Sequence, residues 1–276
     1  MSTVWINGSL APASSARVSP FDHGLLTGDG VFETLKVVDG RPFAVRRHLE
    51  RLAFSAQGLG LALPPVLTLR TALDAVIGAN GLASGRLRIT VTGGPSPLGS
   101  DRGSEGPTVI VAGGPLPAWA PMVDVVTVPW PRNERGALAG LKTISYGENV
   151  VALAYAKQRG GGEAVFGNLV GNLCEGTGTN VFLAVDGGAR LVTPPLSSGC
   201  LAGVTRALLL EAGVAVEEDV PLGALAAATE AFLCSTTRDV HPISSVDGSD
   251  LALCPGPLTT AAAAAFAELV TRSDDP

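Results

Sequence analysis

Gly140-Leu141-Lys142-Thr143-Ile144-Ser145-Tyr146 sets a lysine among small and apolar residues. The chain has 19 lysine and arginine residues, and only Lys36, Lys142 and Lys157 are lysines. A lysine amine forms an imine with an aldehyde, which an arginine guanidinium cannot do. Apolar surroundings disfavour the charged ammonium, so they favour the neutral form that attacks an aldehyde. The sequence therefore predicts that Lys142 is a reactive amine, although a surface lysine is the plainer interpretation of this residue by itself.

A carboxylate follows in the glycine- and threonine-rich stretch Cys174-Glu175-Gly176-Thr177-Gly178-Thr179-Asn180, just ahead of a predicted strand over 181–185. Glu175 by itself could be an ordinary turn or capping carboxylate. Together with a reactive lysine it fits an enzyme of pyridoxal 5′-phosphate (PLP), in which lysine holds the aldehyde and an acid keeps the ring nitrogen protonated. We therefore predict that Lys142 is catalytic and also moves a proton at the substrate carbon.

A phosphate group needs a set of hydrogen-bond donors, and three places in the sequence offer them. Gly203-Val204-Thr205-Arg206 opens a predicted helix over 204–211, whose first amides and dipole suit a dianion. Ser235-Thr236-Thr237 follows a predicted strand over 230–234, and Arg51 lies on a predicted helix over 47–59. None of these features is specific alone, but with Lys142 and Glu175 they form a coherent set.

Composition limits the partners that this chain would bind. Its net charge of −6 and pI of about 5.1 disfavour nucleic acid. No apolar stretch approaches the roughly 20 residues that span a bilayer, and the first residues show no secretory signal, so we expect a cytoplasmic protein without membrane contact. Four scattered cysteines and three histidines predict no metal site. A mean hydropathy of +0.34 suggests that subunits bury some apolar surface.

Strands and helices are mixed along the chain without a strict βαβ alternation, which predicts an α/β (α+β) fold. The proline- and glycine-rich residues 113–121 break every regular pattern. We therefore expect an N-terminal α/β domain at 1–114, a linker at 115–121 and a larger cofactor-binding domain at 122–276. Further strands are predicted at 4–10, 32–38, 86–92, 108–112, 123–128 and 190–193, and further helices at 67–80, 149–159 and 259–270.

Six ordered motifs resemble the class IV aminotransferases, the fold-type IV PLP enzymes, over nearly the whole chain. They are Gly28-Asp29-Gly30-Val31-Phe32-Glu33, His48-Leu49-Glu50-Arg51-Leu52, Leu141-Lys142-Thr143, Glu175-Gly176 with Asn180-Val181-Phe182, Gly203-Val204-Thr205-Arg206 and Ser235-Thr236-Thr237. The resemblance implies that Lys142 is the Schiff-base lysine and that Glu175 contacts the pyridine nitrogen. It implies that the phosphate is held by Arg51, Val204, Thr205 and Thr236, and that Tyr146 lies beside the cofactor. It also implies a homodimer with PLP in the cleft between two domains.

The family contains D-amino acid and branched-chain transaminases, (R)-amine transaminases and 4-amino-4-deoxychorismate lyase, and the sequence leaves the reaction open. The Arg-x-His by which D-amino acid transaminases bind the substrate carboxylate is replaced by Leu98-Gly99-Ser100. Lys36, Arg88, Arg102 and Thr237 are the remaining candidates for substrate binding. We expect a transaminase that moves an amino group from an amino acid, preferably a D-amino acid, or an amine to a 2-keto acid. The alternatives are the lyase, which would release pyruvate and 4-aminobenzoate, and a PLP-binding protein without turnover.

Overall fold

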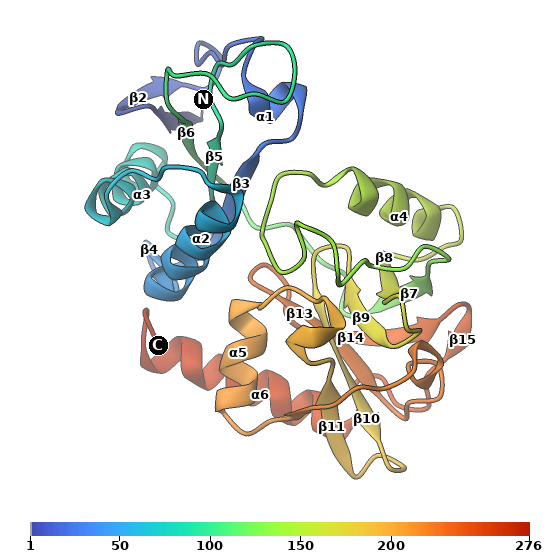
Figure 1. Ribbon diagram of the computed structural model, residues 1–276. Coiled ribbons are helices and arrows are strands. Elements are labelled where there is room, and N and C mark those ends of the chain that lie inside the picture. The colour runs from blue at the N-terminus through green and yellow to red at the C-terminus, as the bar shows by residue number, and fades with distance from the viewer. Residues whose placement is uncertain (1) are drawn as a thin grey trace. The chain divides into compact units, whose positions relative to one another are not determined.

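The computed structural model describes residues 2–276 of the chain, which divide into two compact units (Figure 1). The first unit contains residues 2–117, 141–146 and 274–276. The second contains residues 118–140 and 147–273. Within residues 2–276, no helix is both long and apolar enough to cross a membrane. The mixed α/β fold that the sequence predicts is confirmed.

The first unit is built on a six-stranded sheet in the order β2-β1-β6-β5-β3-β4, in which every neighbouring pair is antiparallel. Its strands are β1 (Thr3–Ile6), β2 (Ser9–Pro12), β3 (Gly30–Val38), β4 (Arg41–Pro42), β5 (Gly85–Thr92) and β6 (Thr108–Gly114). Asp39 and Gly40 join β3 to β4 with positive φ angles of 48° and 74°, as a two-residue hairpin turn requires. The short helix α1 (His23–Leu26) precedes β3.

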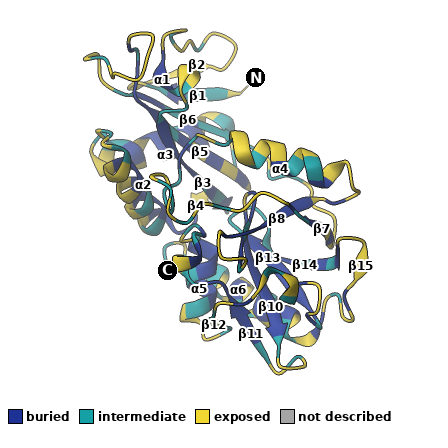
Figure 2. Ribbon diagram, turned by 45° about the vertical axis from the view of Figure 1, so that its right-hand side comes forward, coloured by how far each residue is buried: buried dark blue, intermediate teal, exposed yellow. Residues whose placement is uncertain are grey.

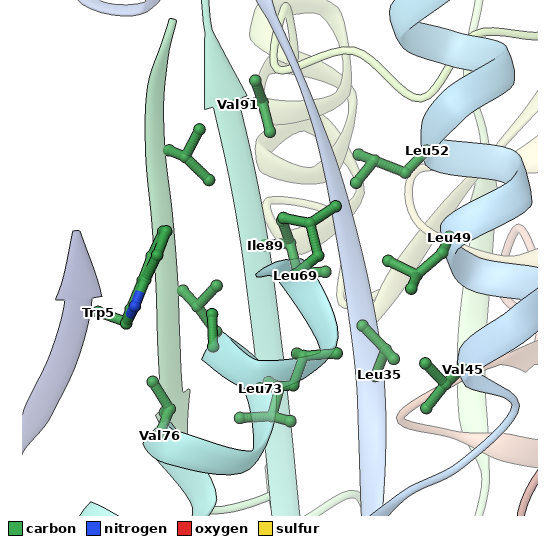
Figure 3. Packing of buried hydrophobic residues seen from close by; sticks show 14 of the residues in the cluster. Trp5, Leu35, Val45, Leu49, Leu52, Leu69, Leu73, Val76, Ile89 and Val91 are labelled. Carbon is green, nitrogen blue, oxygen red and sulfur yellow. The ribbon is translucent and has the colours of Figure 1, made fainter. Parts of the chain in front are cut away.

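Two helices of the first unit, α2 (Val45–Leu59) and α3 (Val66–Asn80), pack on one face of this sheet. Figure 3 shows Leu49 and Leu52 of α2 and Leu69 and Leu73 of α3 in one cluster with Leu35 and Ile89 of the sheet. These side chains are at most 4% exposed, so they form a continuous apolar core. The opposite face of the sheet carries polar and charged residues, among them those of the candidate site described below.

The segment Leu141–Tyr146 extends this sheet, although it lies far along the chain. The Phe32 amide donates to the Lys142 carbonyl at 3.0 Å, and the Ile144 amide donates to the Gly30 carbonyl at 2.9 Å. Val31 and Thr143 form an antiparallel bridge between these bonds. Lys142 therefore belongs to the first unit, whereas the sequence predicts that all of 122–276 lies in the second domain. Composition cannot show such pairing, because hydrogen bonds to β3 and not the local sequence place the segment.

The second unit contains a nine-stranded sheet in the order β12-β11-β10-β13-β14-β7-β8-β9, with β15 paired to β14. Its strands are β7 (Val123–Thr127), β8 (Glu163–Gly167), β9 (Leu173–Gly176), β10 (Asn180–Val185), β11 (Arg190–Thr193), β12 (Val216–Glu217), β13 (Ala231–Ser235), β14 (Asp239–Val246) and β15 (Ser249–Asp250). β7 and β8 are parallel and are connected through α4 (Gly147–Lys157). A parallel pair needs such a crossover, because a tight hairpin cannot return the chain in the same direction.

Helices α5 (Val204–Glu211) and α6 (Pro257–Arg272) also pack on this sheet, against β13 and β14 respectively, and two short 3₁₀ turns lie at Leu196–Ser198 and Leu222–Ala224. Ala152 and Ala156 of α4 pack with Phe166 of β8 in one apolar cluster. In Figure 2 the strands of the sheet are buried, whereas α4 has an exposed outer face. The strand ends at β9, β10 and β13 carry the candidate site residues of this unit.

Candidate active site

The ring of Phe32 is the centre of the candidate site in the first unit. The Lys142 Nζ lies 4.4 Å from the ring centroid and the Arg88 guanidinium carbon lies 3.7 Å from it. The Tyr146 ring meets Phe32 edge to face, with centroids 5.1 Å apart. Three residues predicted from the sequence, Lys142, Arg88 and Tyr146, are therefore brought together around one aromatic side chain.

The strand register explains this arrangement. Phe32 lies opposite Thr90 and Thr34 lies opposite Arg88, so Arg88 is a diagonal neighbour of Phe32 on the same face of the sheet. The Arg88 Nε donates to the Thr90 hydroxyl at 3.1 Å, which directs the guanidinium along the strand. Burial lowers the pKa of Arg88, because desolvation disfavours the charged guanidinium. Lys36 lies on the same face, since β3 side chains alternate, and it pairs with Arg86 across the strands.

Arg51 of α2 is held by a buried carboxylate on the other face of β3. Glu33 accepts from the Arg51 Nε and Nη2, each at 2.7 Å, and lies 2.7 Å from the His48 Nδ1. Glu33 is 0% exposed. Burial alone would raise the pKa of Glu33, but the charge and hydrogen bonds of Arg51, aided by His48, hold it far below its usual range. Burial lowers the pKa of His48, although the charge and hydrogen bond of Glu33 oppose this shift.

Arg102 is engaged by groups of its own unit. Its Nε and Nη2 donate to the two carboxylate oxygens of Asp29 at 2.7 and 2.6 Å, and its Nη groups also donate to the carbonyls of Gly60 and Leu59. The hydrogen bond to Arg102 lowers the pKa of Asp29. His23 lies beside this pair, with Nδ1 3.4 Å from Asp29. A paired guanidinium of this kind is less able to bind a further carboxylate than Arg88 is.

Glu175, at the end of β9, is the centre of the candidate site in the second unit. One carboxylate oxygen accepts from the Leu201 amide at 2.8 Å, and the other lies 3.1 Å from the Arg132 Nε. Arg132 also donates to Glu148 at 2.7 Å and to Asn149 at 2.9 Å, and its guanidinium stacks on the Phe166 ring at 4.0 Å. Arg132 and the Leu201 amide therefore fix the orientation of the Glu175 carboxylate.

The helix α5 begins beside Glu175, because Asn180 connects the two segments. The Asn180 Nδ2 donates to the Leu201 carbonyl at 2.9 Å, and a Cβ on Gly203 would collide with the Asn180 Oδ1. In the described residues, no side chain caps the N-terminus of this helix at Gly203. Its first amides and the buried Thr205 hydroxyl are therefore arranged to suit an anion.

The turn that contains Thr236 and Thr237 lies next to the same segment. Asn180 pairs with Cys234 in the antiparallel ladder between β10 and β13, so the start of β10 and the end of β13 adjoin. Segments 175–180, 201–205 and 234–237 therefore converge in the second unit. Val204, Thr205, Thr236 and Thr237 are thus brought to the same edge of the sheet as Glu175.

Sequence reasoning missed Phe32, Glu33 and Arg132 as functional contacts, and it missed the buried pair of Glu163 and Arg238. The Nη2 of Arg238 donates to Glu163 at 2.7 Å, and the two side chains are 6% and 3% exposed. A lone carboxylate opening the apolar stretch Glu163-Ala164-Val165-Phe166 is a signal for a buried partner, since an isolated buried charge is costly. In residues 2–276, no group of three or more His, Cys, Asp or Glu side chains could hold a metal ion.

Comparison with known proteins identifies the family. The family model described as amino-transferase class IV matches residues 30–246. A putative branched-chain-amino-acid aminotransferase of Methanocaldococcus jannaschii is 34% identical over 257 residues, which is 89% of this chain and 88% of that protein. The D-alanine aminotransferase of Staphylococcus epidermidis is 28% identical over 278 residues, or 91% of each chain.

Solved structures give the same result. The branched-chain amino acid aminotransferase of Escherichia coli has a TM-score of 0.91 at 27% identity, over 97% of this chain and 94% of that chain. A second branched-chain amino acid aminotransferase, from T.th. and with pyridoxamine 5′-phosphate, has a TM-score of 0.90 at 25% identity, over 98% and 94% of the two chains. The fold is that of the PLP-dependent transaminases of fold type IV. The chain belongs to the class IV aminotransferases and is a PLP-dependent enzyme, which confirms the resemblance seen in the sequence.

Each unit, taken by itself, has residues whose chemistry fits this cofactor. Glu175 has a carboxylate oriented as an acceptor for a protonated ring nitrogen would need to be, and Lys142 has the primary amine that an aldehyde would need. The start of α5 has amides and a hydroxyl that would suit a phosphate, and Arg51, although paired with the buried Glu33, would add a guanidinium. Lys142 and Arg51 belong to the first unit, whereas Glu175 and the start of α5 belong to the second.

Proposed function

We propose that the chain is an amino acid transaminase in which Lys142 is the catalytic base and Arg88, with Lys36, binds the substrate carboxylate. The observation that carries this proposal is the contact of Lys142 and Arg88 with the same Phe32 ring. An α-amino acid bears its carboxylate on the carbon that also carries the amine. A cation close to the reactive lysine therefore favours an amino acid over a simple amine as the donor. Arg102 is a weaker candidate, because Asp29 already neutralises it.

The cofactor contacts follow from the same set. We propose that Glu175 accepts from the ring nitrogen, that Arg51, Val204, Thr205 and Thr236 hold the phosphate, and that Tyr146 lies beside the ring. PLP supplies an aldehyde that takes up the substrate amine and a ring that withdraws electrons from the α-carbon. Lys142 then moves the proton released at the α-carbon, and Thr237 contributes to binding the substrate.

A D-amino acid is the preferred donor in this proposal, with a branched-chain L-amino acid as the second candidate. D-alanine aminotransferases of Staphylococcus and Listeria species are 28–29% identical over most of the chain, whereas the 34% identical relative is a putative branched-chain enzyme. The lyase is the third outcome to test. Lys36, Arg86 and Arg88 on one face of the sheet could also bind its substrate with two carboxylates.

The deciding experiment mixes the PLP-loaded enzyme with D-alanine, L-leucine or (R)-1-phenylethylamine and follows the visible absorbance of the cofactor. We expect D-alanine to convert the cofactor fastest and (R)-1-phenylethylamine slowest. A parallel sample receives aminodeoxychorismate and is assayed for pyruvate and 4-aminobenzoate. If every amine were inactive while 4-aminobenzoate was released quickly, the chain would be the lyase.

Arg88→Gln tests the residue assignment, with Arg86→Gln as the matched control on the same strand and face. Loss of one charged hydrogen bond, about 1.5–3 kcal/mol, should raise the KM for D-alanine by about 10- to 100-fold. Arg86→Gln and Arg102→Gln should leave it within about threefold. If the KM for D-alanine rose equally in Arg88→Gln and Arg86→Gln, the proposed role of Arg88 would be contradicted.

We also propose a cytoplasmic homodimer. Phe21, Leu25 and Leu26 at α1 are 52%, 70% and 40% exposed, and the neighbouring loop exposes Leu98 at 77%. Ser96 donates its amide to the Phe21 carbonyl, so these exposed apolar residues lie on adjoining segments, and we propose that the subunits meet there. All four cysteines are free thiols, as is common in a reducing compartment. Leu25→Glu should shift the mass measured by light scattering from dimer to monomer, whereas Leu67→Glu, an exposed leucine on α3, should not.

A further inference from the structure

The turn from β13 to β14 contains a buried arginine that the proposed mechanism does not use. Arg238 follows directly on Thr236 and Thr237, and its amide donates to the Ser235 carbonyl at 3.2 Å. The next residue, Asp239, has a φ of 54°, which closes the turn tightly. The geometry of the two threonines therefore depends on how Arg238 is held.

Arg238 is fixed on three sides within the second unit. Its Nη2 donates to the Glu163 Oε2 at 2.7 Å, and its Nη1 lies 3.1 Å from the His241 Nδ1. The guanidinium stacks on the Trp119 ring with its central carbon 3.8 Å from the centroid. The same indole donates through Nε1 to the Thr237 carbonyl at 2.9 Å. Trp119 thus clamps both the arginine and the backbone of the turn.

Histidine completes this arrangement as a neutral ring. The His241 Nε2 lies 2.8 Å from the Ala120 carbonyl, so it carries the proton and leaves Nδ1 to accept from Arg238. Burial lowers the pKa of His241, and the adjacent Arg238 lowers it further. A protonated ring would place a second cation against the guanidinium.

Glu163 links this turn to the loop that bears Glu175. Its other oxygen, Oε1, accepts from the Thr177 amide at 3.0 Å and also from the Thr177 hydroxyl. One carboxylate therefore joins the loop after Glu175 to the turn with Thr236. The carboxylate and guanidinium are both shielded from solvent, so their hydrogen bonds are not weakened by water as surface pairs are.

We propose that Arg238, held by Glu163 and Trp119, is a positioning residue that sets the phosphate affinity of the enzyme through the Thr236–Thr237 turn. This inference rests on the proposed role of Thr236 as a phosphate ligand. Arg238 does not itself need to touch the phosphate. Glu163 has a wider role, because it positions the loop at Glu175 as well as the turn.

The test compares the affinity of the apoenzyme for PLP and for pyridoxal, which lacks the phosphate. In Arg238→Met, a side chain of similar length keeps the contact with Trp119 but loses the charge. We expect PLP to bind about tenfold more weakly, the equivalent of about 1.4 kcal/mol, with pyridoxal changed less than about twofold. Glu163→Gln should weaken the binding of both compounds. Arg159→Met is the matched control, since Arg159 also stacks on an aromatic ring, that of Tyr155 at 3.5 Å, and should change neither affinity.

Arg238→Lys keeps the positive charge but loses the forked guanidinium, so we expect a PLP affinity between those of wild type and Arg238→Met. This variant provides a second test in case Arg238→Met does not fold. An unchanged ratio of PLP to pyridoxal affinity in folded Arg238→Met or Arg238→Lys would overturn the inference. The proposed function is tested separately, by reducing the wild-type holoenzyme with borohydride and locating the adduct by mass spectrometry. An adduct that is absent from Lys142 would refute the proposed function whatever the affinity ratio.

Discussion

Replacing Glu33 by glutamine should destabilise the apoenzyme strongly, because this carboxylate is the buried partner of Arg51. Glu33 accepts two hydrogen bonds from Arg51 at 2.7 Å and is 0% exposed. Removing one partner of a buried ion pair costs about 3–5 kcal/mol. Glutamine keeps one acceptor oxygen but turns an amide NH₂ toward the donors of Arg51, so we expect the lower end, about 3 kcal/mol.

The assay is urea unfolding of the apoenzyme, followed by circular dichroism. With an m-value of about 2 kcal/mol/M, a loss of about 3 kcal/mol lowers the unfolding midpoint of the first unit by about 1.5 M. Glu50→Gln is the matched control, since Glu50 lies on α2 and pairs with Arg46 at 3.2 Å, but its side chain is 62% exposed. A surface pair contributes about 0–1 kcal/mol, so the control midpoint should fall by at most about 0.5 M. If Glu33→Gln lowered the midpoint no more than Glu50→Gln did, the buried pair would not stabilise the unit as we describe.

Three further results are expected. Wild type should be more stable than Glu33→Gln at pH 7, and this difference should shrink as the pH falls below the ordinary glutamate pKa of about 4.3. Burial alone would raise the pKa of Glu33, but Arg51 holds it lower in the folded state. Acid therefore protonates Glu33 in the unfolded chain first, which favours unfolding. Urea midpoints from pH 7 to pH 3 measure this, and a difference that did not vary with pH would contradict it. Arg132→Met should weaken PLP binding to the apoenzyme about fivefold by releasing Glu175, whereas the exposed Arg135→Met should not, as equilibrium dialysis would show. Asp29→Asn should speed tryptic cleavage after Arg102 about tenfold, and the exposed Asp101→Asn serves as its control; equal rates would contradict the role of this ion pair.

Elements with strong local signals could be predicted from the sequence. The helix at 204–211 has the predicted bounds, and the Asp39-Gly40 hairpin lies where its turn residues place it. By contrast, the sequence predicts one strand at 4–10, but these residues form β1 and β2 with a turn at Asn7 and Gly8, where φ is 44° and 101°. An Asn-Gly pair is a strong signal for a hairpin turn, but the apolar residues on both sides of it also fit one continuous strand. Short strands such as β8 and β9 have too few residues to show a period.

The candidate site could be predicted only in part, because its residues come from distant segments. The sequence predicts Lys142 as a site residue from its chemistry, since lysine is rare in this chain. Phe32, the neighbour of Lys142, is not predicted, because their proximity follows from the pairing of residues 141–146 with β3. The partner of Arg102, Asp29, is 73 positions away, and no local pattern connects them. Ion pairs between residues so far apart in the sequence can be identified only once the fold is known.

The attachment of residues 141–146 to β3 has a consequence for exchanging parts between related enzymes. A chimera with a single crossover in the linker would combine the sheet of one parent with residues 141–146 of the other. The hydrogen bond between Phe32 and Lys142 would then join segments from two different proteins. A chimera should therefore take residues 2–117, 141–146 and 274–276 from the same parent. Further crossovers at 140 and 147, in addition to the one in the linker, should keep Lys142 and β3 from the same parent.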